Sequence, residues 1–388
     1  MTRLAMPAVL AEDAHLSALR DEVRAFVAEE TEAGRIAARV DSWLGGWDEH
    51  FSRRLAARGW LGMTIPAMYG GRGSTHLERF VVTEELLAAG APVAAHWIAD
   101  RQVAPSLLKY GTEEQKSALL SGIAAGEIFF GIGMSEPDSG SDLASVRTKA
   151  TRVDGGWRIQ GSKVWTSGAH RAHYFIVLAR SAPVDEADRH AGLSQFIVDL
   201  RAPGVDIRPI RSLDGSHHFN EVFLDEVFVA DSWVFGAIGS GWEQVTSELG
   251  YERSGPERFL STYPLLDGLV RRQVRAPEDD DGTAPAPEIG RALARTAALH
   301  QLSAAVAGGL ARGEQVDVAA AVVKVLGTAH EGDIAELASA EGLEGEVGGD
   351  SVLAHLASSA LTQRPGFTLR GGTNEILRGV IARGMGLR

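Results

Sequence analysis

The chain has 388 residues, of which 45% are apolar and 23% charged, and this argues for two or three folded domains and against disorder along its whole length. The formal net charge of −13 disfavours a general role on nucleic acid, because phosphate binding needs a basic surface. There is no cysteine, which excludes disulfides, zinc–thiolate sites, cysteine-ligated clusters and thiol nucleophiles.

Targeting signals are not recognisable in the sequence. Residues Met1–Ala11 lack a basic region followed by a long apolar run, so we expect no signal peptide. Apolar stretches such as Tyr174–Ala179 are too short to cross a bilayer, so we expect no membrane span. The expected location is therefore the cytoplasm.

Helical periodicity marks the first third of the chain. Leu16, Leu19, Val23 and Phe26 recur at helical spacing on one face, and Glu84–Ala89 is again helix-forming.

A further helix is predicted after residue 112. Thr112 and Gln115 have the spacing of a capping box, an apolar stripe through Leu119 and Ile123 follows, and Gly126 marks the end.

Residues 129 to 234 have a different texture, with short segments rich in β-branched and aromatic residues. Turn tripeptides at Asp154–Gly156 and Asp214–Ser216 separate some of them. Such spacing indicates a small β-barrel or sandwich. The expected strands are Trp157–Gln160, Lys163–Ser167, Tyr174–Arg180, Gln195–Asp199, Val205–Ile210 and Glu221–Val229.

Helical periodicity returns after Gly239–Gly241 and lasts almost to the end, interrupted by an acidic, Pro-rich segment at Arg275–Pro287 that we expect to be a mobile loop. The order of elements predicts an α+β fold with segregated layers. We expect an N-terminal helical domain at 1–127, a central small β-barrel or sandwich domain at 128–235 and a C-terminal helical bundle at 236–388.

Nucleotide-binding and hydrolase fingerprints are missing. The sequence contains no G-x-G-x-x-G, no Walker A motif and no G-x-S-x-G elbow, so Rossmann, P-loop and serine hydrolase sites have no local support.

Two segments of the strand-rich region carry polar groups that suit a binding site. The loop Gly133–Asp142 reads GMSEPDSGSD, and its hydroxyls and N–H groups can hold phosphate oxygens or the polar edge of a flavin; a plain solvated loop is the alternative. One hairpin later, Lys163–Ser167 sets Trp165 beside two hydroxyls, although core packing alone also explains a tryptophan.

Together these segments resemble the acyl-CoA dehydrogenase family, which has a Thr-Glu-Pro-x-x-Gly-Ser-Asp loop followed after one hairpin by a Lys-x-Trp-x-Thr/Ser strand. Further similarity lies in GWLG at 59–62, the Pro and YGG of 66–71, YGTEEQK at 110–116 and GGTNEI at 371–376. The resemblance covers nearly the whole chain. The combination of motifs is specific, whereas no single piece is.

The resemblance implies three domains and a bound FAD, which makes the chain a flavoprotein and an oxidoreductase of lipid metabolism. It implies the following FAD contacts: Met134 and Ser135 at the pyrimidine edge, Trp165 against the ring, Ser167 near flavin N5, Ser141 at the boundary with the substrate, and Thr373 and Glu375 near the C-terminus.

Catalysis in the family needs a carboxylate beside the substrate Cα. Many relatives carry it in a Tyr-Glu-Gly-Thr motif, but here the matching position is Gly371. Others carry it in a Leu-x-x-Glu-Arg motif, which matches Leu249 to Arg253, so Glu252 is the candidate base. An exposed helix carboxylate is the alternative. The same resemblance places Tyr251, Arg253 and Gly371 beside the substrate, together with Ser141.

Two family elements that reach a neighbouring subunit's FAD are not recognisable. An Arg-x-x-Phe-Gly segment is expected near Arg275–Arg291, and a Gln-x-x-Gly-Gly element near Ala329–Gly349. Both are missing together in one type of subunit of bacterial two-subunit acyl-CoA dehydrogenases, including those of sterol side-chain degradation. The chain is therefore expected in a homo- or hetero-oligomer, a dimer or tetramer.

The resemblance implies dehydrogenation of an acyl-CoA to a 2-enoyl-CoA, with Glu252 taking the Cα proton and hydride passing to flavin N5. The thioester is carried by CoA or by a carrier protein, and an electron-transfer flavoprotein or a similar acceptor is the expected electron partner. Two alternatives stay open: a non-catalytic partner subunit, and a flavin monooxygenase on the same fold.

Overall fold

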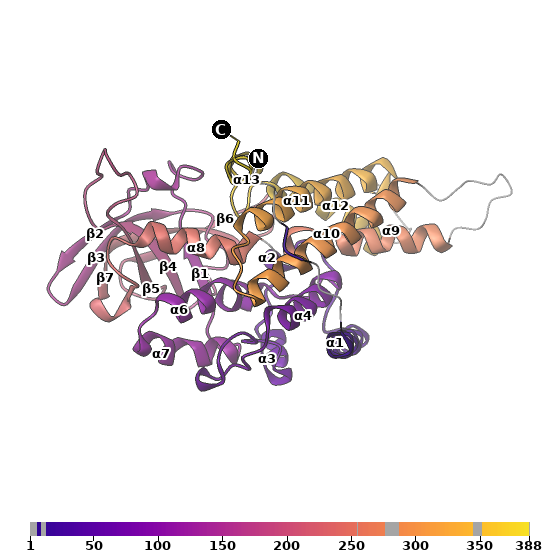
Figure 1. Ribbon diagram of the computed structural model, residues 1–388, viewed down its shortest axis with the longest axis horizontal. Helices are drawn as coiled ribbons and strands as arrows, with labels where there is room; N and C mark the ends of the chain where they lie inside the picture. Colours follow the sequence, from indigo (N-terminus) through magenta and orange to yellow (C-terminus); the bar gives the residue numbers. More distant parts are fainter. Residues whose placement is uncertain (1–5, 9–12, 254, 276–286, 344–350, 388) are drawn as a thin grey trace. The chain divides into compact units, whose positions relative to one another are not determined.

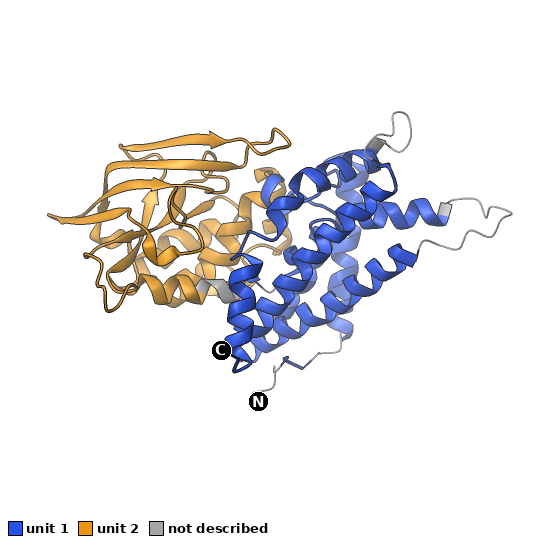
Figure 2. Ribbon diagram, turned by 90° about the horizontal axis from the view of Figure 1, so that it is seen from above, with its two compact units in different colours: residues 1–46, 75–92, 253–388 blue, residues 47–74, 93–252 orange. Residues whose placement is uncertain are grey.

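The computed structural model describes residues 6–8, 13–253, 255–275, 287–343 and 351–387, and only the backbone of residues 248–252, 275 and 351. Contacts between Cα atoms divide the chain into two compact units (Figure 2). The helical unit comprises residues 1–46, 75–92 and 253–388, and the β-unit comprises residues 47–74 and 93–252. Each is described by itself.

Short helices surround the sheet of the β-unit: α3 (Glu49–Arg58), α5 (Ala94–Ile98), α6 (Ala104–Tyr110), α7 (Glu113–Ala124) and α8 (Gly241–Arg253). The capping box predicted for α7 is confirmed, since Thr112 accepts from the Gln115 N–H and the Gln115 side chain accepts from the Thr112 N–H. Leu119 and Ile123 of α7 pack on Ile176 and Ile197 of the sheet. The amphipathic face of the helix thus covers one side of the strands.

A single eight-stranded sheet forms the middle of the chain, in the order β6-β7-β3-β2-β4-β5-β8 with β1 beside β4. Its strands are β1 (Phe130–Gly133), β2 (Lys149–Val153), β3 (Gly156–Lys163), β4 (Tyr174–Arg180), β5 (Leu193–Asp199), β6 (Val205–Ile210), β7 (Phe219–Ala230) and β8 (Val234–Phe235). Two expected strands, β4 and β6, have the predicted bounds. The strands β1, β2 and β8 were not predicted, because they are short and lack an apolar alternation of their own.

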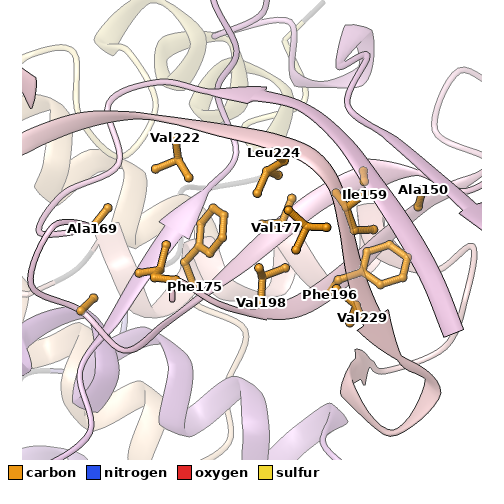
Figure 3. Packing of buried hydrophobic residues seen from close by; sticks show 14 of the residues in the cluster. Ala150, Ile159, Ala169, Phe175, Val177, Phe196, Val198, Val222, Leu224 and Val229 are labelled. Atoms are coloured by element: carbon orange, nitrogen blue, oxygen red, sulfur yellow. The ribbon is translucent and has the colours of Figure 1, made fainter. Parts of the chain in front are cut away.

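The sheet folds into two layers that are joined by little backbone pairing. Between β2 and β4 the only paired residues are Lys149 and Arg180, whereas β3 and β7 pair over most of their length. Phe175 and Val177 of β4 point towards Val222 and Leu224 of β7 across a shared core (Figure 3). Burial of both faces explains the continuous apolar run of β4.

The strand expected over Lys163–Ser167 is wrong. Strand β3 ends at Lys163, which pairs with Val222, and the next reciprocal backbone bonds join Thr166 to Asn220. Two residues, 164 and 165, therefore stand opposite the single residue 221, as in a β-bulge. Trp165 has a left-handed backbone with φ +61°, which lies outside the extended region of a regular strand.

The helical unit is a bundle of helices. Its α-helices are α1 (Ala14–Glu32), α2 (Ser42–Gly45), α4 (His76–Ala88), α9 (Tyr263–Arg275), α10 (Pro287–Ala311), α11 (Asp317–Ala340), α12 (Ser351–Phe367) and α13 (Asn374–Gly384). Helices α10, α11 and α12 lie side by side (Figure 1). Their core joins leucines of α9 and α12 to the alanines of α11, whose small side chains allow close approach.

The predicted order of helices, strands and helices is confirmed, as is the α+β fold class. The division into three consecutive domains stays a prediction, because contacts group residues 47–74 and 93–127 with the sheet and residues 75–92 with the C-terminal helices. Most of the acidic loop, the 344–349 segment and nearly all of Met1–Ala11 lie outside the described residues. No helix in the part of the chain that the structure describes is long and apolar enough to cross a membrane.

Candidate active site

The loop after β1 is shaped by a tight turn. Glu136 and Ser139 bond each other through both backbone N–H groups, at 2.7 and 3.1 Å, so Pro137 and Asp138 form an exposed tip. Met134 and Ser135 before the turn are half-buried, whereas Ser141 after it is exposed. The turn thus separates Met134 and Ser135 from Ser141, the third predicted FAD contact of this loop.

A buried ion pair connects this loop to β3. Lys163 is fully buried, and its Nζ lies 2.8 Å from Glu136 Oε1 and 3.1 Å from the Met134 carbonyl oxygen. The two oxygens of Glu136 also accept the backbone N–H groups of Arg147, at 2.6 Å, and Thr148, at 2.8 Å. One carboxylate therefore ties three segments of the β-unit together.

Burial has opposite effects on the two partners. It lowers the pKa of Lys163 to about 8, against the attraction of Glu136. In Glu136 burial acts to raise the pKa, but the Lys163 ammonium and the bonded N–H groups outweigh it and the pKa is lowered. The carboxylate is thus the firmly charged member.

The Trp165 turn, defined as residues 164–168, is attached to the same loop. The Val164 N–H donates to the Ser135 carbonyl at 2.9 Å. Trp165 follows with 58% of its surface exposed, touching Phe219 edge-on with the ring centroids 5.6 Å apart. Ser167 is half-buried at the end of the turn. The structure therefore brings together the segments that carry Met134 and Ser135 and those that carry Trp165 and Ser167.

Trp165 is outside the sheet core, contrary to the simpler explanation of a tryptophan in this region. A non-glycine residue in a left-handed conformation costs about 1–3 kcal/mol, and such strain concentrates at functional sites. An exposed indole held in this way can stack on a flat aromatic ligand. The residues of the turn therefore fit the ring of a flavin.

In the helical unit, the Gly371 loop (residues 368–373) connects α12 to α13. Thr373 is the N-cap of α13 and accepts from the Ile376 N–H at 3.3 Å, while Glu375 is exposed in the first turn. The buried Lys324 donates to the Thr368 carbonyl and to the Asn374 side chain, both at 2.8 Å. The loop that carries Gly371 and Thr373 is thus anchored at both ends by one ammonium.

Gly371 is confined by two arginines. It has φ +66°, and a Cβ at this position would lie 2.9 Å from Arg258 Nη2. Arg258 is 1% exposed and lies over the Trp43 ring at 5.1 Å, so it has little room to withdraw. Arg253 Nε donates to the Gly371 carbonyl at 3.1 Å. A side chain at position 371, and with it a base, would displace the Arg258 guanidinium and strain a left-handed backbone.

The candidate base lies at the C-terminal end of α8. Tyr251 and Glu252 belong to this helix, but their side chains are outside the described residues, so their roles stay predictions. Arg253, the last residue of the helix, is half-buried and joined to Gly371.

The sequence missed the residues that hold these segments in place. Lys163 and Glu136 belong to the motifs of the resemblance, but nothing in the local sequence showed that they pair. Asn220 and Lys324 gave no local signal, since the segments that they hold, at Thr166 and Thr368, are distant in the chain. Within the described ranges, no cluster of His, Asp and Glu could hold a metal ion.

Family models match most of the first two thirds of the chain. The model "Acyl-CoA dehydrogenase, N-terminal domain" matches residues 13–127, and "Acyl-CoA dehydrogenase, middle domain" matches residues 131–227.

Two curated relatives come from Mycobacterium tuberculosis. Acyl-CoA dehydrogenase FadE34 is 35% identical over 374 residues, which are 95% of this chain and 48% of the relative. Acyl-CoA dehydrogenase FadE29 is 33% identical over 342 residues, 85% of this chain and 86% of the relative. The chain thus spans about half the length of FadE34.

Two solved structures share the fold over nearly the whole chain. One is the Tcur3481-Tcur3483 steroid ACAD, with a TM-score of 0.83, 32% identity and coverage of 97% of this chain and 99% of the other. The second is the ChsE4-ChsE5 complex from Mycobacterium tuberculosis, with a TM-score of 0.82, 27% identity and coverage of 98% and 100%.

The ion pair between Lys163 and Glu136 yields a stability prediction. Lys163→Met leaves a buried carboxylate without its ammonium, and breaking such a pair costs about 3–5 kcal/mol. We expect the free energy of unfolding, measured by urea titration, to fall by that order. The double variant Lys163→Met/Glu136→Gln should lose less than the two single changes together.

The matched control is Asp206→Asn, which removes the exposed ion pair with Arg208 on β6. It should change stability by about 0–1 kcal/mol. Equal losses in the control and in Lys163→Met would show that burial of the pair does not matter.

Proposed function

This chain belongs to the acyl-CoA dehydrogenase family, whose members are FAD-dependent flavoproteins, and we propose that it dehydrogenates an acyl thioester between Cα and Cβ. One observation carries the proposal: the Met134–Ser135 loop and the Trp165 turn are bonded together, with the indole exposed beside them. These are the two motifs that contact flavin in the resemblance.

FAD, when bound, supplies the ring that accepts the electrons removed from the substrate. In the proposed site Met134 and Ser135 bind the pyrimidine edge, Trp165 stacks on the ring and Ser167 lies near N5. Ser141 lies at the substrate boundary. Thr373 and Glu375 bind the cofactor from the start of α13, where N–H groups of a helix N-terminus favour anionic groups.

Glu252 takes the proton from Cα in this proposal. The assignment is supported by the alternative position of the base in the family, which is Gly371 here. This glycine has no carboxylate, and Arg258 fills the space beside it. Arg253, the residue that follows Glu252 in the chain, donates to the Gly371 carbonyl. Hydrogen bonds to the thioester carbonyl would stabilise the negative charge that develops when the proton leaves.

We further propose that the chain is one subunit of a two-subunit enzyme and that its acyl group is polycyclic. Two structural relatives carry two chain names in their titles, and one of these titles says steroid. The two elements that reach a neighbour's FAD are not recognisable in this sequence. The electron acceptor would be an electron-transfer flavoprotein or a similar protein.

Glu252→Gln tests the base. The variant should keep FAD and substrate but reduce its flavin about 10²–10⁴-fold more slowly, as is typical when a general base is removed. The measurement is anaerobic flavin bleaching by a steroid side-chain acyl-CoA in a stopped-flow instrument, with the partner subunit present. Glu243→Gln, an exposed carboxylate on the same helix, is the control and should bleach normally. Normal bleaching in Glu252→Gln would assign the base to another residue.

Trp165→Ala tests the flavin site. Stacking of aromatic rings contributes about 0.5–1.5 kcal/mol beyond the buried area, so we expect FAD to bind roughly 10-fold more weakly and its visible spectrum to shift. Phe228→Ala removes another exposed aromatic of the sheet, 46% exposed, and should leave both properties unchanged. An unaltered spectrum and affinity in Trp165→Ala would place the flavin elsewhere.

The subunit proposal is tested by the ratio of FAD to chain. The purified chain alone should hold less than one FAD, and the ratio should rise when a candidate partner is added. Absorbance at 450 nm against protein concentration measures it, with size-exclusion chromatography to follow assembly. One tightly held FAD per chain in a homo-oligomer would contradict the two-subunit assignment and leave the dehydrogenase assignment standing.

A further inference from the structure

Asn220, the second residue of β7, is completely buried and lies directly opposite the Trp165 turn. Its backbone exchanges two hydrogen bonds with Thr166, at 3.0 and 3.1 Å. Its side-chain Nδ2 donates to the Thr166 carbonyl at 3.0 Å and to the His218 carbonyl at 3.2 Å. Since the His218 carbonyl also accepts the Gly168 N–H at 2.8 Å, the amide links Thr166 in the middle of the turn to the carbonyl that holds Gly168 at its end.

The orientation of this amide follows from its neighbours. Two carbonyl oxygens face Nδ2, so exchanging the nitrogen and oxygen of the amide would set oxygen against oxygen. On the other side Oδ1 lies 2.9 Å from His217 Nε2, which must donate. Nδ2 also lies 3.1 Å from His170 Nδ1, which can accept by sharing one of the two amide hydrogens with a carbonyl.

The rings of His170 and His217 stack with their centroids 4.2 Å apart and complete what we call the Asn220 cluster: Asn220, His170 and His217. Three charged or titratable groups lie near His170: His217, Arg171 and His218. The residue is partly exposed, but desolvation of its ring, followed by the nearby His217 and Arg171, lowers the pKa of His170 to about 4. A neutral His170 is the form that can accept from the amide.

The cluster borders the strained residue of the turn. Asn220 follows Phe219, which contacts Trp165 edge-on, and its amide bonds Thr166, the next residue after Trp165. A left-handed tryptophan persists only where its surroundings enforce it. The Asn220 side chain faces four hydrogen-bonding groups here, in addition to the backbone pair, and its two amide hydrogens are shared among three of them.

We propose that Asn220 is a positioning residue for the proposed flavin site: its amide, held by His170 and His217, keeps the Trp165 turn in the conformation that presents the indole and Ser167. The inference rests on the proposed function for the identity of the ligand. The hydrogen-bond cluster itself is a property of this chain alone.

The test variant is Asn220→Asp, which preserves shape but sets a carboxylate against the Thr166 and His218 carbonyls. Hydrogen exchange of the Thr166 and Gly168 amides should become at least ~10-fold faster in the chain without added FAD, a change of about 1.4 kcal/mol in local opening. In the FAD-bound protein the visible spectrum should shift and FAD should be released faster. Asn220→Ser, with one donor retained, should be intermediate.

The control is Gln115→Ala on α7. Gln115 is an equally buried amide that donates to two backbone carbonyls, those of Ser232 and Val234, at 2.8 Å. It should lower overall stability without changing exchange at Thr166 and Gly168 or the flavin spectrum. A purely structural role for Asn220 would make the two variants behave alike.

The pH dependence gives a second readout. A His170 pKa that is lower in the closed turn than in the open one means that protons favour the open turn. Protection of the two amides should therefore be greatest above pH 6.5 and fall as the pH drops from 6.5 towards about 4. His170→Gln should remove this dependence, whereas His50→Gln, an exposed histidine on α3, should keep it.

The outcomes separate the two proposals. Unchanged exchange at Thr166 and Gly168 in a folded Asn220→Asp protein overturns the positioning role. Faster exchange with an unaltered flavin spectrum and FAD affinity supports the cluster but contradicts the proposed flavin site. Faster exchange together with altered flavin supports both.

Discussion

The ion pair of Lys163 and Glu136 is the interaction on which the geometry of the β-unit depends. Both groups are buried, and a buried charge is tolerated only when it is paired and hydrogen-bonded. Glu136 meets this condition by accepting two backbone N–H groups as well as the ammonium. The loop Gly133–Asp142 is thereby fixed to β3, the strand that leads into the Trp165 turn. The two motifs are therefore close in space although they are separated in the sequence.

The β-bulge after Lys163 has a consequence for side-chain direction. In a regular strand, Lys163 and Trp165 would point to the same face, and the lysine points inward. The extra residue and the left-handed backbone of Trp165 change this direction, so that the indole is exposed while Lys163 is buried. One inserted residue therefore allows Lys163 to be a buried anchor while Trp165, in the same motif, is exposed.

Much of the fold was predictable because its signals are local. The capping box of Thr112 and the apolar run of Tyr174–Arg180 depend on neighbours within a few residues, and both appear as expected. The Trp165 turn was not predictable, since its conformation is set by Asn220, more than fifty residues later. The resemblance named Met134, Ser135, Trp165 and Ser167, but only the structure explains why their segments lie together. The side chain of Glu252 is not described, so its role stays a prediction.

The Gly371 loop is organised by cations, although the chain as a whole carries a net charge of −13. Lys324 binds its two ends, Arg253 binds its middle, and the Arg258 guanidinium lies against its glycine. A carboxylate at position 371 would need both a permissive backbone and the withdrawal of a buried guanidinium. The proposed base is accordingly assigned to another element, as Glu252 on α8.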